Sequence, residues 1–235
     1  MPQHVHVFED PDAWVHESVA FLANALADGQ RLRPWASLAL SGGSTPAPVY
    51  EALARHDGVD WSRVRIYFCD DRCVPPDHEH SNVRLAREHL VGPAGIPDAN
   101  VFPMACTDAP DVAAEAYDAL LREHFAGPPR FDAAVLGIGD DGHTCSLFPG
   151  SYALEERQRL CLHTEAPAGM PVHDRITLTY PALAGCRHAI FLVRGESKRG
   201  PLREALNGKL PAGKVHLTEG ELVWNVDRAA YGPGA

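Results

Sequence analysis

Short apolar runs alternate with longer amphipathic stretches along the chain, and this alternation restricts the fold more than any other feature. Apolar runs of about four to eight residues are typical of buried strands, and helices between such strands connect parallel neighbours. The pattern predicts a three-layer α/β/α, Rossmann-like fold with a mostly parallel sheet, and we interpret residues 1–235 as a single domain. Strands are expected at residues 5–8, 36–40, 63–68, 131–138, 175–180, 188–193 and 221–226.

The stretches between these runs carry the end signals of helices. Pro46 is suited to a helix start, Ser81 to an N-cap, and Gly29 and Gly208 to helix ends. The Pro- and Gly-rich loops are short, so none of them is interpreted as an interdomain linker. Helices are therefore expected at residues 12–29, 46–56, 81–91, 111–125 and 197–208.

Charge and hydropathy limit the classes of function. The formal net charge of −10 opposes binding to nucleic acid or to an anionic membrane, because both need a cationic surface. A small anionic substrate remains compatible, since it responds to the local field of a pocket. No apolar run approaches the roughly 20 residues that span a bilayer, and the N-terminus lacks the pattern of a secretory signal. We expect a cytoplasmic protein; its oligomeric state is left open, and a monomer fits the sequence.

The six cysteines are spread through the chain. Cys69 and Cys73 are the closest pair, and they lack the Cys-x-x-Cys spacing of a redox or zinc motif. Reduced, mostly buried thiols are therefore expected rather than a disulfide framework. The cysteines are Cys69, Cys73, Cys106, Cys145, Cys161 and Cys186.

The segment LALSGGSTPAPVYEAL (38–53) joins an expected strand to an expected helix through a glycine-containing turn. Glycines allow the backbone to approach an oxyanion closely, and the free N–H groups of a helix N-terminus favour phosphate. The spacing is that of neither a Walker A loop nor a dinucleotide fingerprint. Phosphate binding by Gly42, Gly43, Ser44 and Thr45 and a simple capped turn are both compatible with this segment alone.

The segment YFCDDRCVPPDHEHSNVRLAREHL (67–90) places charged side chains just after a strand, where open α/β sheets bind their ligands. Asp70 is a candidate acid or base, or a group that orients one, and Arg72 is a candidate phosphate ligand. A solvated Asp–Arg pair on a turn is the structural alternative. His78 and His80 lack nearby cysteines at ligand spacing, so a solvated loop is favoured over zinc.

The segment GIGDDGHTCSLFPG (137–150) follows the apolar run FDAAVL and concentrates ionisable groups in a glycine-rich turn. Histidine suits a general base because its charge changes near neutral pH. We interpret His143 in this way, with Asp141 fixing the tautomer and stabilising the imidazolium. The alternative is a histidine that caps the next turn. Cys145 and Ser146 lack a nucleophile-elbow motif, so they are assigned to packing and hydrogen bonding.

The segment RITLTYPALAGCRHAIFLVRGESKRGPLREAL (175–206) begins with Arg175 and places Lys198 in the first turn of an expected helix. A cation at a helix N-terminus opposes the helix dipole, and a bound anion would relieve that conflict. A lysine that extends into solvent is the simpler alternative.

Taken together, these segments resemble the 6-phosphogluconolactonase family, within the larger group that shares the glucosamine-6-phosphate deaminase type of fold. The resemblance extends from near the N-terminus to about residue 230, and the order and spacing of the motifs make it specific. The matching motifs are SGGSTP (41–46), DDRCVPPDHEHSN (70–82), GIGDDGHTCSLFPG (137–150), RITLTYPAL (175–183), GESK (195–198) and LVWNVDRAA (222–230).

The resemblance implies hydrolysis of 6-phospho-D-glucono-1,5-lactone to 6-phosphogluconate, in the oxidative pentose phosphate pathway, without an organic cofactor or metal. His143 matches the family's proposed general base, and Arg175 matches an active-site arginine whose side of the substrate the sequence leaves open. Arg72, Lys198 and the loop 42–45 match positions expected around the phosphate. The family usually has Glu at Asp71, which leaves the role of Asp71 open, and often Ala at Cys145, whose thiol is a potential oxidation site.

Two other functions share parts of this pattern. Deaminases of the group follow the histidine with a glutamate-bearing segment, whereas TCSLFPG (144–150) contains no acid, which favours the lactonase. A sugar-phosphate sensor would normally have a DNA-binding module, for which a strand beginning at residue 5 leaves no room. A catalytically silent binder remains open, because the sequence does not show whether His143 is correctly placed.

Overall fold

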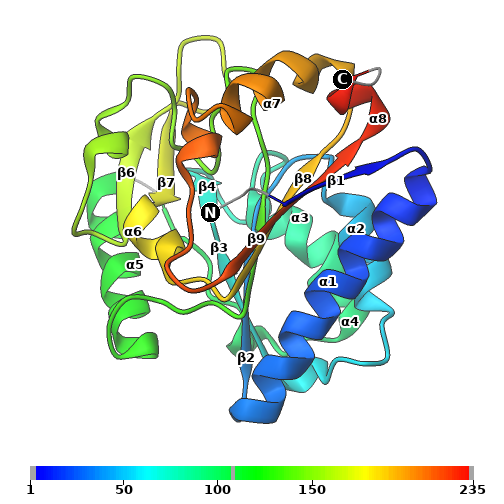
Figure 1. The fold of residues 1–235 in the computed structure, drawn as a ribbon. Helices are drawn as coiled ribbons and strands as arrows, with labels where there is room; N and C mark the ends of the chain where they lie inside the picture. Colours follow the sequence, from blue (N-terminus) through cyan, green and yellow to red (C-terminus); the bar gives the residue numbers. More distant parts are fainter. Residues whose placement is uncertain (1–3, 107–108, 233–235) are drawn as a thin grey trace.

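The computed structural model describes residues 4–106 and 109–232 and has a six-stranded, fully parallel sheet at its centre (Figure 1). The strand order is β1-β9-β8-β5-β2-β3, which confirms the predicted parallel α/β architecture. The strands are β1 (His4–Phe8), β2 (Ala36–Leu40), β3 (Val64–Phe68), β5 (Ala133–Leu136), β8 (His188–Val193) and β9 (Glu221–Asp227).

The central strands are apolar because both faces of the sheet are covered. All residues of β2 and β5 are buried, as expected for parallel strands between helical layers. The chain leaves β2 toward β3 on one side and later adds β5 on the other side of β2. Such a reversal of strand order opens a crevice at the carboxyl ends of β2 and β5, where open α/β sheets bind their ligands.

Helices form the layers on either side of this sheet (Figure 1). One side carries α1 (Pro11–Leu32), α2 (Ala47–Ala54), α3 (Asn82–Ala86) and α4 (Gly92–Ala94), with the π-helical turn Arg87–Val91 between the last two. The other side carries α5 (Pro110–Phe125) and α6 (Tyr180–Ala184). The remaining helices, α7 (Arg199–Leu206) and α8 (Arg228–Tyr231), follow β8 and β9. Short 3₁₀ turns lie at Trp61–Arg63, Asp98–Asn100, Tyr152–Glu155, Glu196–Lys198 and Pro211–Lys214.

A second, antiparallel sheet packs beside the first and was not predicted. It contains β4 (Asp70–Arg72), β7 (Asp174–Leu178) and β6 (Cys161–Glu165), in the order β4-β7-β6. The strand expected at 175–180 is therefore β7 and lies outside the parallel sheet. It ends at Leu178 because Thr179 caps α6, accepting a hydrogen bond from the Ala182 N–H. The short β4 consists of charged residues, so it has no apolar pattern to reveal it.

Three of the four predicted helix-end signals are confirmed. Pro46 and Ser81 occupy the N-cap positions of α2 and α3, and Gly208, at φ 72°, lies just beyond α7. The prediction for Gly29 was wrong, since α1 continues to Leu32. Gly29 instead allows close packing, because a Cβ there would lie 2.7 Å from Cγ of the buried Asp132.

The expectation that all cysteines are thiols was wrong for one pair. Cys73 and Cys106 form a disulfide, with Cα atoms 4.8 Å apart and 33 residues of sequence separation. The fold brings the end of β4 against the segment before α5, a contact that no local pattern reveals. The other four cysteines are free and buried, as predicted. Within the described ranges, no helix is both long and apolar enough to cross a bilayer.

Candidate active site

A cleft of about 410 Å³ lies at the carboxyl ends of the parallel strands, and nearly all predicted site residues line it. The loops after β2, β5 and β8 and residues of the small sheet all contribute to its wall. Asp141 does not line the cleft and contacts His143 instead. The predicted residues that line the cleft are Gly42, Gly43, Ser44, Thr45, Asp70, Arg72, His143, Arg175 and Lys198.

His143 and Asp141 form a hydrogen-bonded pair in the turn after β5. The His143 Nδ1 atom lies 2.5 Å from Asp141 Oδ1, and the His143 backbone N–H donates to the same oxygen at 3.0 Å. Two glycines make this geometry accessible. Gly142 has φ 83°, and a Cβ at Gly139 would lie 2.2 Å from the His143 ring. The turn therefore brings the imidazole against its own backbone.

The charge state of Asp141 determines which nitrogen of His143 carries the proton. Partial burial opposes ionisation of Asp141, but hydrogen bonds from the His143 ring and backbone hold the pKa of this carboxyl below its usual range. An ionised carboxylate can only accept a hydrogen bond, so Nδ1 of His143 is the donor. The Nε2 atom of the neutral ring then has a free lone pair, as a general base requires.

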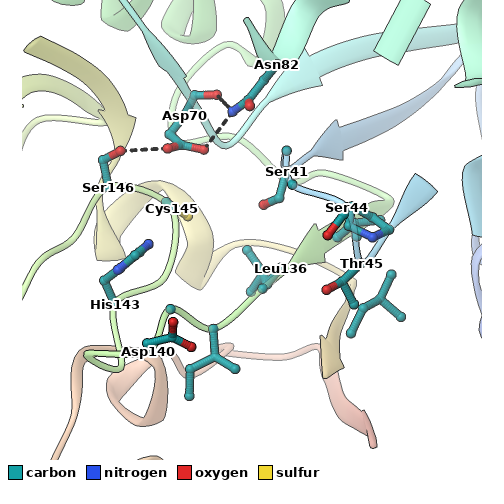
Figure 2. Close-up of a pocket in the computed structure, with 18 of the residues that line it drawn as sticks. Ser41, Ser44, Thr45, Asp70, Asn82, Leu136, Asp140, His143, Cys145 and Ser146 are labelled. Atoms are coloured by element: carbon teal, nitrogen blue, oxygen red, sulfur yellow. Dashed lines mark hydrogen bonds between the residues drawn. The ribbon is translucent and has the colours of Figure 1, made fainter. Parts of the chain in front are cut away.

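Asp70 is held by two side chains from distant parts of the chain (Figure 2). The Ser146 hydroxyl donates to Asp70 Oδ2 at 2.6 Å, and Asn82 Nδ2 donates to Asp70 Oδ1 at 3.1 Å. All three residues are buried and line the cleft. Ser146 was predicted to form hydrogen bonds within its turn; it bonds Asp70 instead, across 76 positions of sequence.

Asp71, whose side chain is one methylene shorter than that of glutamate, reaches three backbone N–H groups. Its carboxylate accepts hydrogen bonds from the backbone N–H groups of Arg72 (2.8 Å), Asn82 (2.7 Å) and Val83 (3.3 Å). Burial raises the pKa of Asp71 to about 6, against the lowering effect of these backbone donors. Asp71 thus joins the end of β4 to the start of α3.

The loop between β2 and α2 presents small residues and hydroxyls to the cleft. Gly43 adopts φ 91°, a conformation that favours glycine, and Ser44 and Thr45 follow it before α2 begins at Ala47. The buried Tyr50 hydroxyl donates to the Ser41 carbonyl at 2.7 Å and fixes the base of the loop. A glycine-containing loop that leads into a helix N-terminus is suited to bind an anion.

Arg72 and Arg175 are direct neighbours, paired in the register of β4 and β7. Arg72 Nη1 donates to the His80 carbonyl at 2.6 Å, and its buried Nε has no partner among the described residues. Arg175 donates from Nε to the Val172 carbonyl (3.0 Å) and from Nη2 to the Pro171 carbonyl (2.6 Å). Burial, followed by repulsion from Arg72, lowers the pKa of Arg175 to about 10, so Arg175 remains cationic at neutral pH.

Lys198 lies in the 3₁₀ turn that leads into α7, and its ammonium group has an acidic partner. Lys198 Nζ donates to Asp140 Oδ1 at 2.6 Å. The lysine side chain is 21% exposed and the aspartate side chain 77% exposed. Asp140 therefore occupies the position near Lys198 where the sequence predicted an anion, and its exposure makes it an exchangeable partner.

Cys145 is an unsuitable nucleophile despite its place in the cleft. A hydrogen bond with Cys69 and burial raise the pKa of its thiol well above the ordinary value, and the thiolate is the reactive form. His78 and His80 contact each other, with the His80 N–H donating to His78 Nδ1 at 3.1 Å. The described part of the chain contains no cluster of three or more side chains suited to a metal ion.

Several lining residues were not predicted. Met170 and Pro171 come from the loop before β7, and Ser41 precedes the glycine turn. Asn82 was overlooked because only its neighbour Ser81 carries a local signal, that of an N-cap. Its contact with Asp70 depends on the pairing of β4 with α3, which the sequence does not reveal.

Fold and site define an open α/β protein with a His–Asp pair and basic side chains in one cleft at the strand ends. The family model described as glucosamine-6-phosphate isomerases/6-phosphogluconolactonase matches residues 9–224. The chain belongs to this family.

Curated relatives and solved structures agree with this assignment. The chain is 37% identical to 6-phosphogluconolactonase of Rattus norvegicus, over 97% of this chain and 93% of the relative. It is 40% identical to that of Synechocystis sp., over 83% and 82% of the two chains. The crystal structure of the Thermotoga maritima 6-phosphogluconolactonase superposes with a TM-score of 0.82 at 32% identity, covering 96% of this chain and 99% of that one. The predicted family is thereby confirmed.

Proposed function

We propose that this chain is a 6-phosphogluconolactonase, which hydrolyses 6-phospho-D-glucono-1,5-lactone to 6-phosphogluconate in the oxidative pentose phosphate pathway. Relatives that bear this name align with most of the chain. The observation that carries the proposal is the His143–Asp141 pair, located in the same cleft as Lys198 and two arginines. Lactone hydrolysis by water needs a base, and a phosphorylated substrate needs cationic ligands.

In the proposed reaction, His143 Nε2 removes a proton from water while the water oxygen attacks the lactone carbonyl carbon. The bond between that carbon and the ring oxygen then breaks, and the imidazolium returns its proton to the departing ring oxygen. Asp141 stabilises the imidazolium through the hydrogen bond to Nδ1. The ring opens to the free acid, which ionises at neutral pH.

The other acid–base candidate, Asp70, is assigned to substrate orientation. Each of its oxygens already accepts one hydrogen bond and retains a lone pair, which suits acceptance from a sugar hydroxyl. His143 and Asp141, together with Asp70, form what we call the acid–base set. Arg175 supports the cleft wall through Pro171 and Val172, and its charge favours the anionic substrate and the developing oxyanion.

The phosphate is assigned to Arg72, Lys198 and the loop 42–45, which we call the phosphate set. The substrate phosphate replaces exposed Asp140 as the partner of Lys198. The buried Nε of Arg72, for which the described ranges provide no partner, is a further donor beside the cleft. Holding the phosphate allows binding energy distant from the carbonyl to position the reacting centre.

The amino-sugar deaminase activity is disfavoured by the segment 144–150. It contributes Cys145, Ser146 and Phe148 to the cleft wall and contains no carboxylate. We further propose a cytoplasmic catalyst that uses residues 1–235 as one domain, since both sheets contribute to the cleft. The net charge of −10 supports a small-molecule substrate rather than nucleic acid or membrane.

The test is the decay of freshly generated 6-phosphogluconolactone at mildly acidic pH, where the uncatalysed reaction is slow, with and without the protein. Glucosamine-6-phosphate is assayed in parallel for ammonia release. Accelerated lactone loss without ammonia supports the proposal. Saturable binding of 6-phosphogluconate without acceleration would instead identify a sugar-phosphate sensor, and ammonia release would identify a deaminase.

A further inference from the structure

Asn82 connects the two sets of side chains through its amide group. The side chain lines the cleft, and the residue is only 2% exposed. Its Nδ2 donates both to the carbonyl oxygen of Asp70, at 2.8 Å, and to the Asp70 carboxylate, at 3.1 Å (Figure 2). The Nδ2 side of the amide therefore binds Asp70, a member of the acid–base set.

The other side of the same amide packs against the phosphate set. A Cβ added to Gly42 would lie 1.8 Å from Asn82 Oδ1 and 2.4 Å from Asn82 Cγ. No side chain larger than hydrogen fits at position 42 while the amide keeps this place. Gly42 is thus required for contact with Asn82, in addition to any need for close approach to an oxyanion.

The backbone of Asn82 is fixed independently of its side chain. Its N–H donates to Asp71 Oδ1 at 2.7 Å, and the next N–H, of Val83, donates to Asp71 Oδ2 at 3.3 Å. Asp71 is 3% exposed and also accepts from the Arg72 N–H. This buried carboxylate holds the start of α3 against β4. The backbone that carries the Asn82 side-chain amide therefore has little freedom to shift.

We propose that Asn82 is a positioning residue that sets the spacing between Asp70 and the phosphate loop at Gly42. The inference rests on the proposed function and deepens it. One substrate must contact both sets at once, and its reacting carbon and its phosphate are separated by a fixed covalent framework. A misplacement of about 1 Å can cost on the order of a hundredfold in rate, so the spacing contributes directly to turnover.

The first test is a double-mutant cycle. Gly42→Ala alone is expected to lower kcat/KM by on the order of a hundredfold, because its methyl group displaces the amide. Asn82→Ala alone is expected to lower kcat/KM roughly tenfold, mainly through kcat. The double variant should resemble Asn82→Ala, because removing the amide leaves room for the methyl group. Multiplicative losses in the double variant would overturn the proposal.

Gly137→Ala provides the matched control for the cycle. Gly137 also lines the cleft, but an added Cβ there meets no atom within 4 Å. Its effect should multiply with that of Asn82→Ala, without coupling. Coupling of the same size in this control pair would show that the first cycle reports general disturbance of the cleft, and would contradict the proposal.

Asn82→Asp separates positioning from space filling. The substitution keeps the shape of the side chain, but it removes the donor to Asp70 and places a second acceptor beside it. We expect kcat to fall roughly tenfold or more, with a smaller change in KM and a melting temperature close to that of Asn82→Ala. Wild-type kcat in this variant would show that the amide only fills space.

Binding of 6-phosphogluconate, measured by calorimetry in the same variants, distinguishes a failure of the proposed lactonase function from a failure of the positioning role of Asn82. If the wild type does not hydrolyse the lactone, the proposed function fails. The positioning role is then judged on binding alone: Gly42→Ala must weaken affinity in the wild-type background and have little effect beside Asn82→Ala. Equal weakening in both backgrounds overturns it.

Discussion

The acid–base set and the phosphate set are held by different kinds of contact. Asp70 accepts a hydrogen bond from the buried Ser146 hydroxyl at 2.6 Å, and His143 Nδ1 donates to Asp141 Oδ1 at 2.5 Å. Lys198 instead pairs with Asp140, whose side chain is 77% exposed. In the proposed mechanism the first set is preorganised, whereas Lys198 of the second set exchanges Asp140 for the substrate phosphate. Changes in the first should therefore lower kcat, and changes in the second should mainly raise KM.

Asp141→Asn should give the largest change apart from loss of the base itself, and it tests the preorganised set. Asparagine offers an amide that can present a donor to Nδ1, so the ring loses its fixed tautomer and the imidazolium loses its partner. We expect kcat to fall roughly 10²–10³-fold with KM little altered. Steady-state lactone hydrolysis measures both constants. An equal rise in KM would place Asp141 in substrate binding and break the distinction.

Asp71 should make stability depend on pH, because its carboxyl group is buried in the folded protein. Burial raises its pKa from an ordinary value near 3.8 to about 6, so the folded protein keeps a proton that the unfolded chain releases in this range. The contribution of Asp71 to the free energy of unfolding should therefore be fully present below about pH 4 and be lost as pH rises to about 6, by up to about 3 kcal/mol.

Denaturant unfolding between these pH values, compared with Asp71→Asn, isolates this contribution. The variant lacks the ionisable group, so the difference in stability between wild type and variant should change with pH. A difference that stays constant across the window would contradict the raised pKa.

Lys198→Ala tests the exchangeable set, with a smaller effect. Loss of one charge-assisted contact to the phosphate should raise KM roughly tenfold, while kcat stays near that of the wild type. Asp140→Asn is the matched control, since it removes the internal competitor and keeps the lysine. It should lower KM severalfold. A large loss of kcat in Lys198→Ala would move this lysine into the acid–base set.

The sequence reveals best what lies within one segment. His143 and Asp141 occupy one turn, so their pairing follows from local spacing. The parallel strands are predictable because they are continuous apolar runs, as expected for strands covered by helices on both faces. The small sheet was missed because β4 has no apolar residue. Gly29 was misread as a helix end because its real role, close packing against Asp132, depends on a residue far away in the sequence.

Contacts between distant segments account for the rest of the site. The links of Asp70 to Ser146 and of Asn82 to Gly42 arise only when β4, α3 and the loops after β2 and β5 meet. The Cys73–Cys106 disulfide has the same origin, since neither cysteine has a paired spacing motif. Lys198 was predicted to face a bound anion; in the structure its partner is the Asp140 carboxylate, and phosphate binding there stays a prediction.

Paired measurements on His143→Asn test the central claim, that turnover and phosphate binding reside in separate sets of side chains. Lactone hydrolysis gives kcat, and calorimetry gives the Kd for 6-phosphogluconate. We predict that kcat falls roughly 10²–10⁴-fold, because the base is lost, while Kd stays close to the wild-type value. Near-normal turnover, or a parallel loss of binding, would contradict the account.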